Sequence, residues 1–316
     1  MISYLKSIFN VFKENIHFFF KYDLNHIQKN LMHQNATIWA LKKKLVEQDV
    51  EKNPELMRNL NEEVSFLRKQ QYPTTFPYPT LKHIEKPVVG RERKNKLPYI
   101  IHNGKKLFFP KYFRESEIIE LYINYIEREN LLGGNFTTKA PHQYQSEKIH
   151  IEQDDVLLDI GCAEGLIALD AIDRVKKVYL FEGEAMWLEP LKATFEPYMD
   201  RVEIIPKFVG SKNAPNTTDL NSIFKDYTNG SFFVKMDIEG CEENVLRENQ
   251  NFFSSSNHIK IACCLYHKAE HQISIPKLLN SWHYQTEFSS GVMFFHLESN
   301  LNSPFLRKGL IRAVKY

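Results

Sequence analysis

Acidic residues and a histidine follow several short apolar runs in the second half of the chain. Asp159 stands near the end of VLLDI, Glu182 follows KVYLF, Asp237 and Glu239 follow SFFVKM, and His267 follows ACCLY. Carboxylates and an imidazole that meet beside a bound ligand are suited to proton transfer and to holding hydroxyl groups. The sequence therefore predicts one site, assembled from residues at the ends of these runs.

A glycine-spaced turn follows the first run. Gly161 and Gly165 allow the backbone to turn tightly and to approach a ligand closely. The motif DIGCAEG lacks the GxGxxG spacing of dinucleotide-binding proteins and is a weak signal alone. Glu182, about twenty residues later, is where an acid can bond both hydroxyls of a ribose. Together they predict a nucleoside cofactor, and Ala163 can be tolerated in the turn if its φ is negative.

These residues need a sheet that brings the ends of the runs together. Apolar runs alternate with helical stretches after residue 150, which favours a doubly wound α/β sheet with ligands at the carboxyl ends of its strands. Period-two alternation predicts Asp237 and Glu239 on one side of the sheet, and adjacent Cys263 and Cys264 in the core. The predicted strands are VLLDI, KVYLF, RVEII, SFFVKMDI and HIKIACCLY, and the predicted helices include LEPLKATFEPYM and CEENVLREN.

The first 70 residues read as a helical arm. Residues 1–23 predict an amphipathic helix, which either packs on its own chain or rests on a membrane surface, since Lys6, Lys13 and Glu14 exclude a spanning segment. Asn53 and Pro54 predict the start of a later helix. Heptad spacing predicts either pairing of two chains or packing against that later helix. The heptad positions are Leu24, Ile27, Leu31, Ile38, Leu41 and Leu45, and the later helix presents Leu56, Leu60, Val64 and Leu67.

Prolines and a basic tract, RERKNK, predict a linker over residues 71–98. A hairpin turning at Asn103-Gly104 is expected next, then a helix over SEIIELYINYIEREN that ends near Gly133-Gly134. The predicted organisation is an arm (1–70), a linker (71–98) and one α/β domain (99–316).

The composition argues against several classes of protein. The chain has 316 residues, is 43% hydrophobic and 25% charged, and carries a formal charge of +2, which argues against disorder and against a nucleic-acid binder with a broad basic field. Its four cysteines form no CxxC pair and no zinc-like spacing with histidines. A reducing, cytoplasmic location is expected, with membrane association through the first helix as the alternative.

Four segments together carry a resemblance to a known family. DIGCAEG, FEGE, VKMDIEGCEENVL and CLYHKAE resemble the FkbM family of S-adenosylmethionine-dependent methyltransferases, over roughly residues 99 to 310. APHQY resembles the family's segment before the first strand, with Ala140 where serine is frequent. FEGE stands where many members have FEPN, and His271 stands where an acid is frequent.

The resemblance implies a class I Rossmann-like fold with S-adenosylmethionine as cofactor. Beside such a cofactor we expect His267 as the base, because the ordinary pKa of histidine lies near neutrality, and Asp237 as the group that orients the acceptor or the base, with His142 and Glu239 on the acceptor side. Beside Asp237, the implied cofactor contacts are Asp159, Gly161, Cys162, Ala163, Glu164, Gly165, Glu182 and Tyr144. No resident metal is expected, although a hard divalent ion at Asp237, Glu239 and His267 stays open as an alternative.

The expected function is methylation of a hydroxyl on a sugar, a glycan or a related metabolite, with no nucleic-acid partner. The alternative is an inactive cofactor-binding or assembly protein whose arm docks a glycan-biosynthesis complex.

Overall fold

The computed structural model describes residues 34–72, 74–211, 215–228, 230–255, 257–296 and 302–315. The chain divides into two compact units, Met1–Thr74 and Thr75–Tyr316. The amphipathic helix predicted for residues 1–23 and the heptad positions Leu24, Ile27 and Leu31 lie outside the described residues. None of the described helices is both long enough and apolar enough to cross a membrane.

The first unit contains a helical hairpin. Residues 34–51 are helical, and α2 (Pro54–Lys69) follows. The predicted cap is confirmed, because the Asn53 side chain accepts hydrogen bonds from the backbone N–H groups of Glu55 (3.0 Å) and Leu56 (3.3 Å). These bonds satisfy two of the donors that every helix start leaves open.

The heptad face of the first of these helices is not packed within the chain, and its pairing with a second chain stays a prediction. Ile38, Leu41 and Leu45 are 48%, 57% and 42% exposed. The buried positions instead include Trp39, Val46 and Val50, and the Trp39 indole and the Lys43 amine both donate to the carbonyl oxygen of Gln70, at 3.2 and 2.8 Å. Tryptophan and lysine can belong to a packed helix face, because the apolar part of each side chain can be buried. A search for aliphatic residues alone therefore missed the face that packs within the chain.

The predicted linker is also wrong over most of its length, because residues 75–98 belong to the second unit. Phe76 and Tyr78 are buried, Thr80 bridges to Thr137, and β1 (Gly90–Arg91) pairs with β2 (Pro98–His102). Prolines remove backbone donors from this segment, but its aromatic side chains still bury in the core.

The hairpin prediction is confirmed. β2 pairs with β3 (Lys105–Phe108) around Asn103 (φ 48°) and Gly104 (φ 80°), the positive angles of a two-residue turn. The following helix is α3 (Glu115–Ile123), which continues as the π-helical turn η1 (Asn124–Arg128).

The main sheet has seven strands in the order β11-β14-β10-β9-β4-β5-β6. Strands β10, β9, β4, β5 and β6 are parallel, whereas β14 is antiparallel to both of its neighbours. The strand order reverses beside β4, and ligands bind at such points in open α/β sheets. The strands are β4 (Val156–Ile160), β5 (Lys177–Phe181), β6 (Val202–Ile205), β9 (Ser231–Met236), β10 (His258–Cys264), β11 (Gln285–Phe288) and β14 (Leu310–Lys315).

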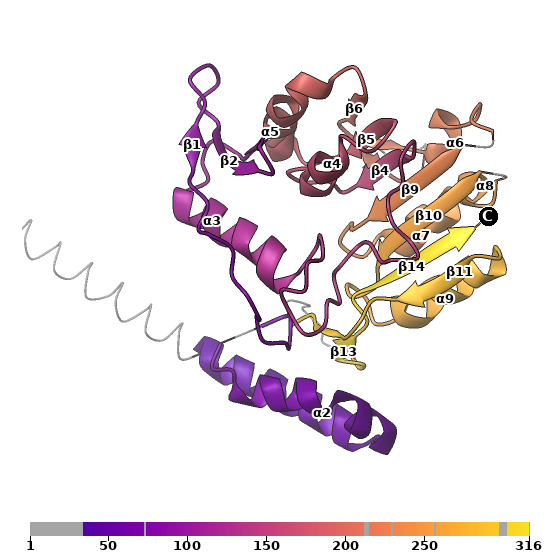
Figure 1. Ribbon diagram of the computed structural model, residues 1–316. Helices are drawn as coiled ribbons and strands as arrows, with labels where there is room; N and C mark the ends of the chain where they lie inside the picture. The colour runs from indigo at the N-terminus through magenta and orange to yellow at the C-terminus, as the bar shows by residue number, and fades with distance from the viewer. Residues whose placement is uncertain are drawn as a thin grey trace, which may run out of the picture. The chain divides into compact units, whose positions relative to one another are not determined.

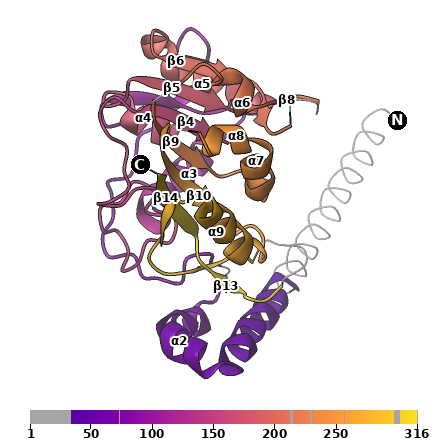
Figure 2. The same cartoon turned by 90° about the vertical axis from the view of Figure 1, so that its right-hand side faces the viewer.

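Helices cover both faces of this sheet (Figures 1 and 2), and each face has its own hydrophobic cluster. Leu157 of β4 belongs to one cluster and its neighbour Leu158 to the other, as alternation along a strand requires. The first cluster involves α3, α4 (Leu166–Ala171) and α5 (Ala185–Phe195), which η2 (Glu196–Tyr198) extends. The second involves α6 (Leu220–Ile223), α7 (Glu242–Glu248), α8 (Gln250–Phe253) and α9 (His271–Ser281). Two short pairs complete the unit: β7 (Phe208–Val209) with β8 (Thr217–Thr218), and β12 (Met293–Phe294) with β13 (Leu306–Arg307).

Candidate active site

A pocket of about 630 Å³ lies at the carboxyl ends of β4, β5 and β9. Five carboxylates contribute to its lining, whereas the described lining residues include no Lys, Arg or His. The lining also includes the aromatic rings of Phe181, Trp187 and Phe208. The acids are Glu182, Glu184, Asp237, Glu239 and Glu248.

The turn after β4 comes very close to the end of β9. Gly161 has φ 71°, and a Cβ at this position would lie 2.2 Å from the carbonyl oxygen of Asp237. Only glycine fits there. Ala163 has φ 46°, which is not the negative φ at which an alanine would fit the turn without strain. The left-handed conformation turns the N–H of Ala163 toward Glu182, and the resulting bond offsets part of the strain.

Backbone N–H groups hold Glu182 in place. Its Oε2 accepts from Ala163 N (2.9 Å) and its Oε1 accepts from Glu184 N (2.8 Å). Burial raises the pKa of Glu182, and these two bonds oppose that rise. Each oxygen keeps a further lone pair for a ligand hydroxyl. At Gly183 a Cβ would lie 2.4 Å from the Phe208 ring, which explains why glycine stands in FEGE.

Other predicted cofactor residues lie outside the pocket lining. Asp159 is buried and its Oδ1 lies 3.1 Å from the Lys235 amine, which also donates to the carbonyl of Gly161 at 2.5 Å. Burial raises the pKa of Glu164 to about 7. Asp159, Cys162, Glu164, Gly165 and Tyr144 do not line the pocket, so their contact with a cofactor stays a prediction.

Asp237 is the centre of a buried hydrogen-bond network. Its Oδ2 accepts from the Tyr144 hydroxyl (2.9 Å) and its Oδ1 accepts from the Tyr266 hydroxyl (3.2 Å). Burial opposes ionisation of this carboxyl, but His142, Lys235 and the charge of His267 outweigh it and hold the pKa of Asp237 far below its usual range. The Asp237 carboxylate is therefore a fixed negative charge.

His142 belongs to the same network. Its Nδ1 lies 2.6 Å from Glu129 Oε2 and its Nε2 lies 3.3 Å from Asp237 Oδ2. Burial alone would lower the pKa of His142, but the bonds to Asp237 and Glu129 raise it to about 9. His142 is enclosed between two carboxylates and does not line the pocket, so its contact with an acceptor stays a prediction. The Arg312 guanidinium holds its loop by donating to the carbonyls of Gln143 (2.8 Å) and Tyr144 (3.2 Å).

His267 lies among three carboxylates. Its Nε2 is 3.5 Å from Asp237 Oδ1 and 3.6 Å from Glu239 Oε2, and its Nδ1 is 2.9 Å from Glu242 Oε1. Burial would lower the pKa of His267, but Glu242 and Asp237 outweigh burial and raise it. Asp237 and Glu239 lie beyond Met236, the last residue of β9. Both side chains nevertheless face His267, so they do lie on the same side, as the sequence predicted. The Glu239 side chain is 88% exposed, with the backbone at φ 54°.

Several residues of the site were missed from the sequence. Lys235 alternates with Asp237 along the strand and lies beside Asp159 in the neighbouring strand, so period-two spacing offered a signal for it. Glu242 reads as an ordinary acid in the first turn of a helix, yet it is fully buried. Tyr266 stands in CLYHKAE directly before His267 but was not singled out, and Glu129, just after η1, carries no signal in the sequence.

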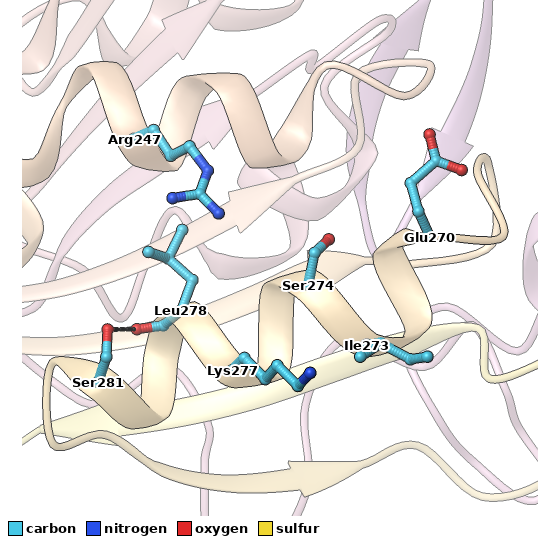
Figure 3. Close-up of a pocket in the computed structure, with 7 residues that line it drawn as sticks. All are labelled: Arg247, Glu270, Ile273, Ser274, Lys277, Leu278 and Ser281. Atoms are coloured by element: carbon cyan, nitrogen blue, oxygen red, sulfur yellow. Dashed lines mark hydrogen bonds between the residues drawn. The ribbon is translucent and has the colours of Figure 1, made fainter.

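A second hollow, of about 500 Å³, lies along α9 (Figure 3). Arg247 points across it from α7, and its guanidinium bonds to Glu243 at 2.7 Å. It shares no residue with the pocket beside Glu182 and contains none of the predicted site residues. The remaining lining residues are Glu270, Ile273, Ser274, Lys277, Leu278 and Ser281.

Comparisons with known proteins add little about function. No protein-family model matches the sequence. A DNA ligase of Mycoplasmopsis synoviae (strain 53) is 25% identical over 137 residues, which cover 43% of this chain. The match spans about a fifth of the ligase's length. The FkbM resemblance therefore stays a prediction.

Several solved structures are similar in arrangement. A precorrin-6y C5,15-methyltransferase from Geobacter metallireducens has a TM-score of 0.35 and 13% identity, covering 53% of this chain and 85% of that one. A putative methyltransferase from Streptococcus mutans, solved with SAH, has a TM-score of 0.36 and 12% identity, covering 53% and 92%. An rRNA methylase from Streptococcus thermophilus has a TM-score of 0.33 and 11% identity, covering 52% and 89%.

Similarity at TM-scores this low gives no information about function. The fold is identified instead from the order and direction of the strands. Five parallel strands that end in an antiparallel pair, with helices on both faces and a pocket at the reversal point, make a methyltransferase-like Rossmann fold.

Proposed function

We propose that the chain is an S-adenosylmethionine-dependent methyltransferase that methylates a hydroxyl group. The observation that carries the proposal is the charge of the pocket: five carboxylates line it, Glu182 among them at the end of β5, and the described lining has no basic side chain. A cofactor with a ribose and a positive charge fits these groups.

The same charge pattern argues against cofactors that carry phosphates. Proteins bind pyrophosphates through helix N-termini, glycine-rich backbone and cationic side chains. Here an anionic ligand would meet carboxylates on several sides, and the repulsion from Glu182 and Asp237, the two acids that are at least partly buried, is the least screened by solvent and salt. A sulfonium cofactor has no phosphate, so the pocket attracts it. Glu182 can bond both ribose hydroxyls, and Phe208 offers an apolar face to an adenine ring.

When bound, S-adenosylmethionine supplies an activated methyl group. The residues of this chain contribute alignment and the exclusion of water, which are the main needs of an in-line displacement. The Asp237 carboxylate lines the pocket and is fixed by Tyr144 and Tyr266, so it can orient an acceptor hydroxyl. His267 adjoins Asp237 and is the imidazole available to take the acceptor's proton.

The acceptor we propose is a hydroxyl of a sugar, a glycan or a related metabolite. Support comes from the resemblance in DIGCAEG, FEGE, VKMDIEGCEENVL and CLYHKAE, and from a base suited to an alcohol, which must lose a proton during methylation. Because its pKa is raised, His267 becomes a base only above the pH at which free histidine does.

Calorimetry with S-adenosylhomocysteine tests the cofactor first. We expect one site per chain for S-adenosylhomocysteine and no heat at that site from NAD or ATP, whose phosphates the five acids repel. Transfer of a labelled methyl group to sugars and glycan fragments without phosphate then tests the acceptor class. Tighter binding of ATP than of S-adenosylhomocysteine would overturn the proposal. Cofactor binding without transfer to any acceptor would instead favour an inactive binding protein.

A further inference from the structure

Unpaired polar atoms gather beside the end of β9. Four buried side-chain polar atoms there lack a hydrogen-bond partner in the described residues: Nδ1 and Nε2 of His267, Oε2 of Glu242 and Nδ1 of His271. Buried polar atoms are nearly always hydrogen-bonded in folded proteins, so a cluster of four calls for an explanation. A bound ion or water is the ordinary one.

The cluster is deeply buried and the members are close to one another. The Glu242 side chain is fully buried and that of His267 is 3% exposed. His267 Nδ1 lies 2.9 Å from Glu242 Oε1 without the geometry of a hydrogen bond, and His271 Nδ1 lies 3.4 Å from Glu242 Oε2. Asp237 completes the group, because its Oδ1 is 3.5 Å from His267 Nε2.

The spacing suits a metal ion. One ligand atom each of Asp237, Glu242 and His267 lie within 4.8 Å of one another. Bonds from imidazole nitrogen or carboxylate oxygen to zinc are about 2.0–2.2 Å, so ligand atoms on opposite sides of an ion lie about 4.2 Å apart. Shifts of a few tenths of an ångström would bring these three atoms into range.

The local charge also favours a cation. Asp237, Glu239 and Glu242 surround the imidazole of His267, and two other cations nearby, His142 and Lys235, act on Asp237 as well as on further acids. Lys235 contacts Asp159, and His142 is shared with Glu129. A protonated His267 balances one of the three carboxylates, whereas a divalent ion balances two.

We propose that Asp237, Glu242 and His267 bind one divalent transition-metal ion, and that His271 orients Glu242 through its second oxygen. Mixed imidazole and carboxylate donors suit Mn²⁺, Fe²⁺ or Zn²⁺ better than Mg²⁺ or Ca²⁺, which prefer all-oxygen sites. Three protein ligands leave coordination positions open, and Asp237 connects the site to the pocket. Glu239, which the sequence offered as a ligand, is too exposed to form the buried part of the site.

The role of the ion, unlike its binding, rests on the proposed function. A divalent cation lowers the pKa of an oxygen that it polarises. Beside the methyl-transfer site, it would favour loss of the acceptor's proton near neutral pH. His267 then serves as a ligand instead of as a free base.

Metal binding is tested without cofactor or acceptor. Full-length protein is dialysed against chelator, then titrated with Mn²⁺, and the free ion is followed by its electron paramagnetic resonance signal. We expect one Mn²⁺ per chain, a higher melting temperature with Mn²⁺ or Zn²⁺, and little effect of Mg²⁺ at the same concentration. Wild type that binds no Mn²⁺ would overturn the proposal, and an equal shift with Mg²⁺ would remove His267 as a ligand.

Two variants and a control locate the site. Glu242→Gln should abolish the rise in melting temperature that Mn²⁺ causes. His271→Gln keeps all three ligands and should weaken Mn²⁺ binding about 10- to 100-fold, as loss of an orienting partner typically does. His283→Asn, at an exposed histidine with φ 65°, should bind like wild type. Full Mn²⁺ affinity in folded His271→Gln would contradict the orienting role, and full affinity in Glu242→Gln would contradict the site. S-adenosylhomocysteine affinity, measured in parallel on chelated protein, tests the proposed function separately.

Discussion

Two acids beside the same pocket are held in different ways. Glu182 is fixed by the backbone N–H groups of Ala163 and Glu184, which are 19 and 2 residues away in the chain. Asp237 is fixed by side chains up to 95 residues away, those of His142, Tyr144 and Tyr266. The first arrangement needs only two adjacent parallel strands, β4 and β5, and the turns that follow them. The second exists only once three distant segments have folded together.

The difference predicts different consequences of mutation. Removing Glu182 takes one group out of a rigid backbone frame, so the effect should be confined to ligand binding. Removing a partner of Asp237 leaves another buried charge uncompensated, so stability and its pH dependence should change as well.

The largest expected effect is on turnover. His267→Ala removes the imidazole beside Asp237, whether it acts as base or as ligand, and should lower turnover about 10²- to 10⁴-fold. Affinity for S-adenosylhomocysteine should change little, since His267 does not line the cofactor pocket. Single-turnover rates with a methyl acceptor, measured from pH 6 to 9, check this. Near-normal turnover across that range would remove His267 from the chemistry.

The pH dependence of stability comes next. The pKa of His142 is raised from 6.5 to about 9, so its contribution is complete below pH 6.5 and is lost as the pH rises toward 9. Linkage gives about 3 kcal/mol for a shift of this size. Urea unfolding at pH 6 and at pH 9.5 should therefore show a clear fall in the free energy of unfolding.

His142→Gln is the control, because Gln can bond to Glu129 and Asp237 but does not titrate. It should lower the free energy of unfolding at pH 6 and remove much of the fall between pH 6 and pH 9.5. A smaller fall should remain, because the pKa of His267 is also raised and acts in the same direction. An unchanged slope in this variant would show that His142 is not the titrating group.

The cofactor acid should have a smaller and more local effect. Glu182→Ala removes a carboxylate that can bond two ribose hydroxyls, and hydrogen bonds to charged groups contribute about 1.5–3 kcal/mol each. S-adenosylhomocysteine should bind about tenfold or more weakly by calorimetry. Glu203→Ala, on exposed β6 surface, is the matched control and should bind like wild type. Unchanged affinity in Glu182→Ala would exclude Glu182 from the ribose site.

The same distinction explains how far the sequence could predict the molecule. The five predicted strands match β4, β5, β6, β9 and β10 within a few residues, because apolar runs and turns are local signals. The Asn53 cap and the Asn103-Gly104 turn are local too. By contrast, the buried face of residues 34–51 and the packing of residues 75–98 depend on partners elsewhere in the chain. Glu242 is hidden for that reason: only the folded chain encloses it between His267 and His271.

The smallest predicted effect concerns the turn at the cofactor pocket. Ala163 has φ 46°, a conformation that costs an alanine about 1 kcal/mol relative to glycine. Ala163→Gly should relieve this strain while keeping the N–H that bonds Glu182, so the melting temperature should rise slightly without loss of S-adenosylhomocysteine affinity. Gly161→Ala is the opposite case, because its Cβ would lie 2.2 Å from the Asp237 carbonyl, and it should both destabilise the fold and weaken binding. In Ala163→Gly the new glycine also gains freedom in the unfolded chain, so the measured gain in stability of this variant can fall below about 1 kcal/mol. A clear loss of stability in Ala163→Gly would show that the methyl group of Ala163 packs usefully and that the turn is not strained there.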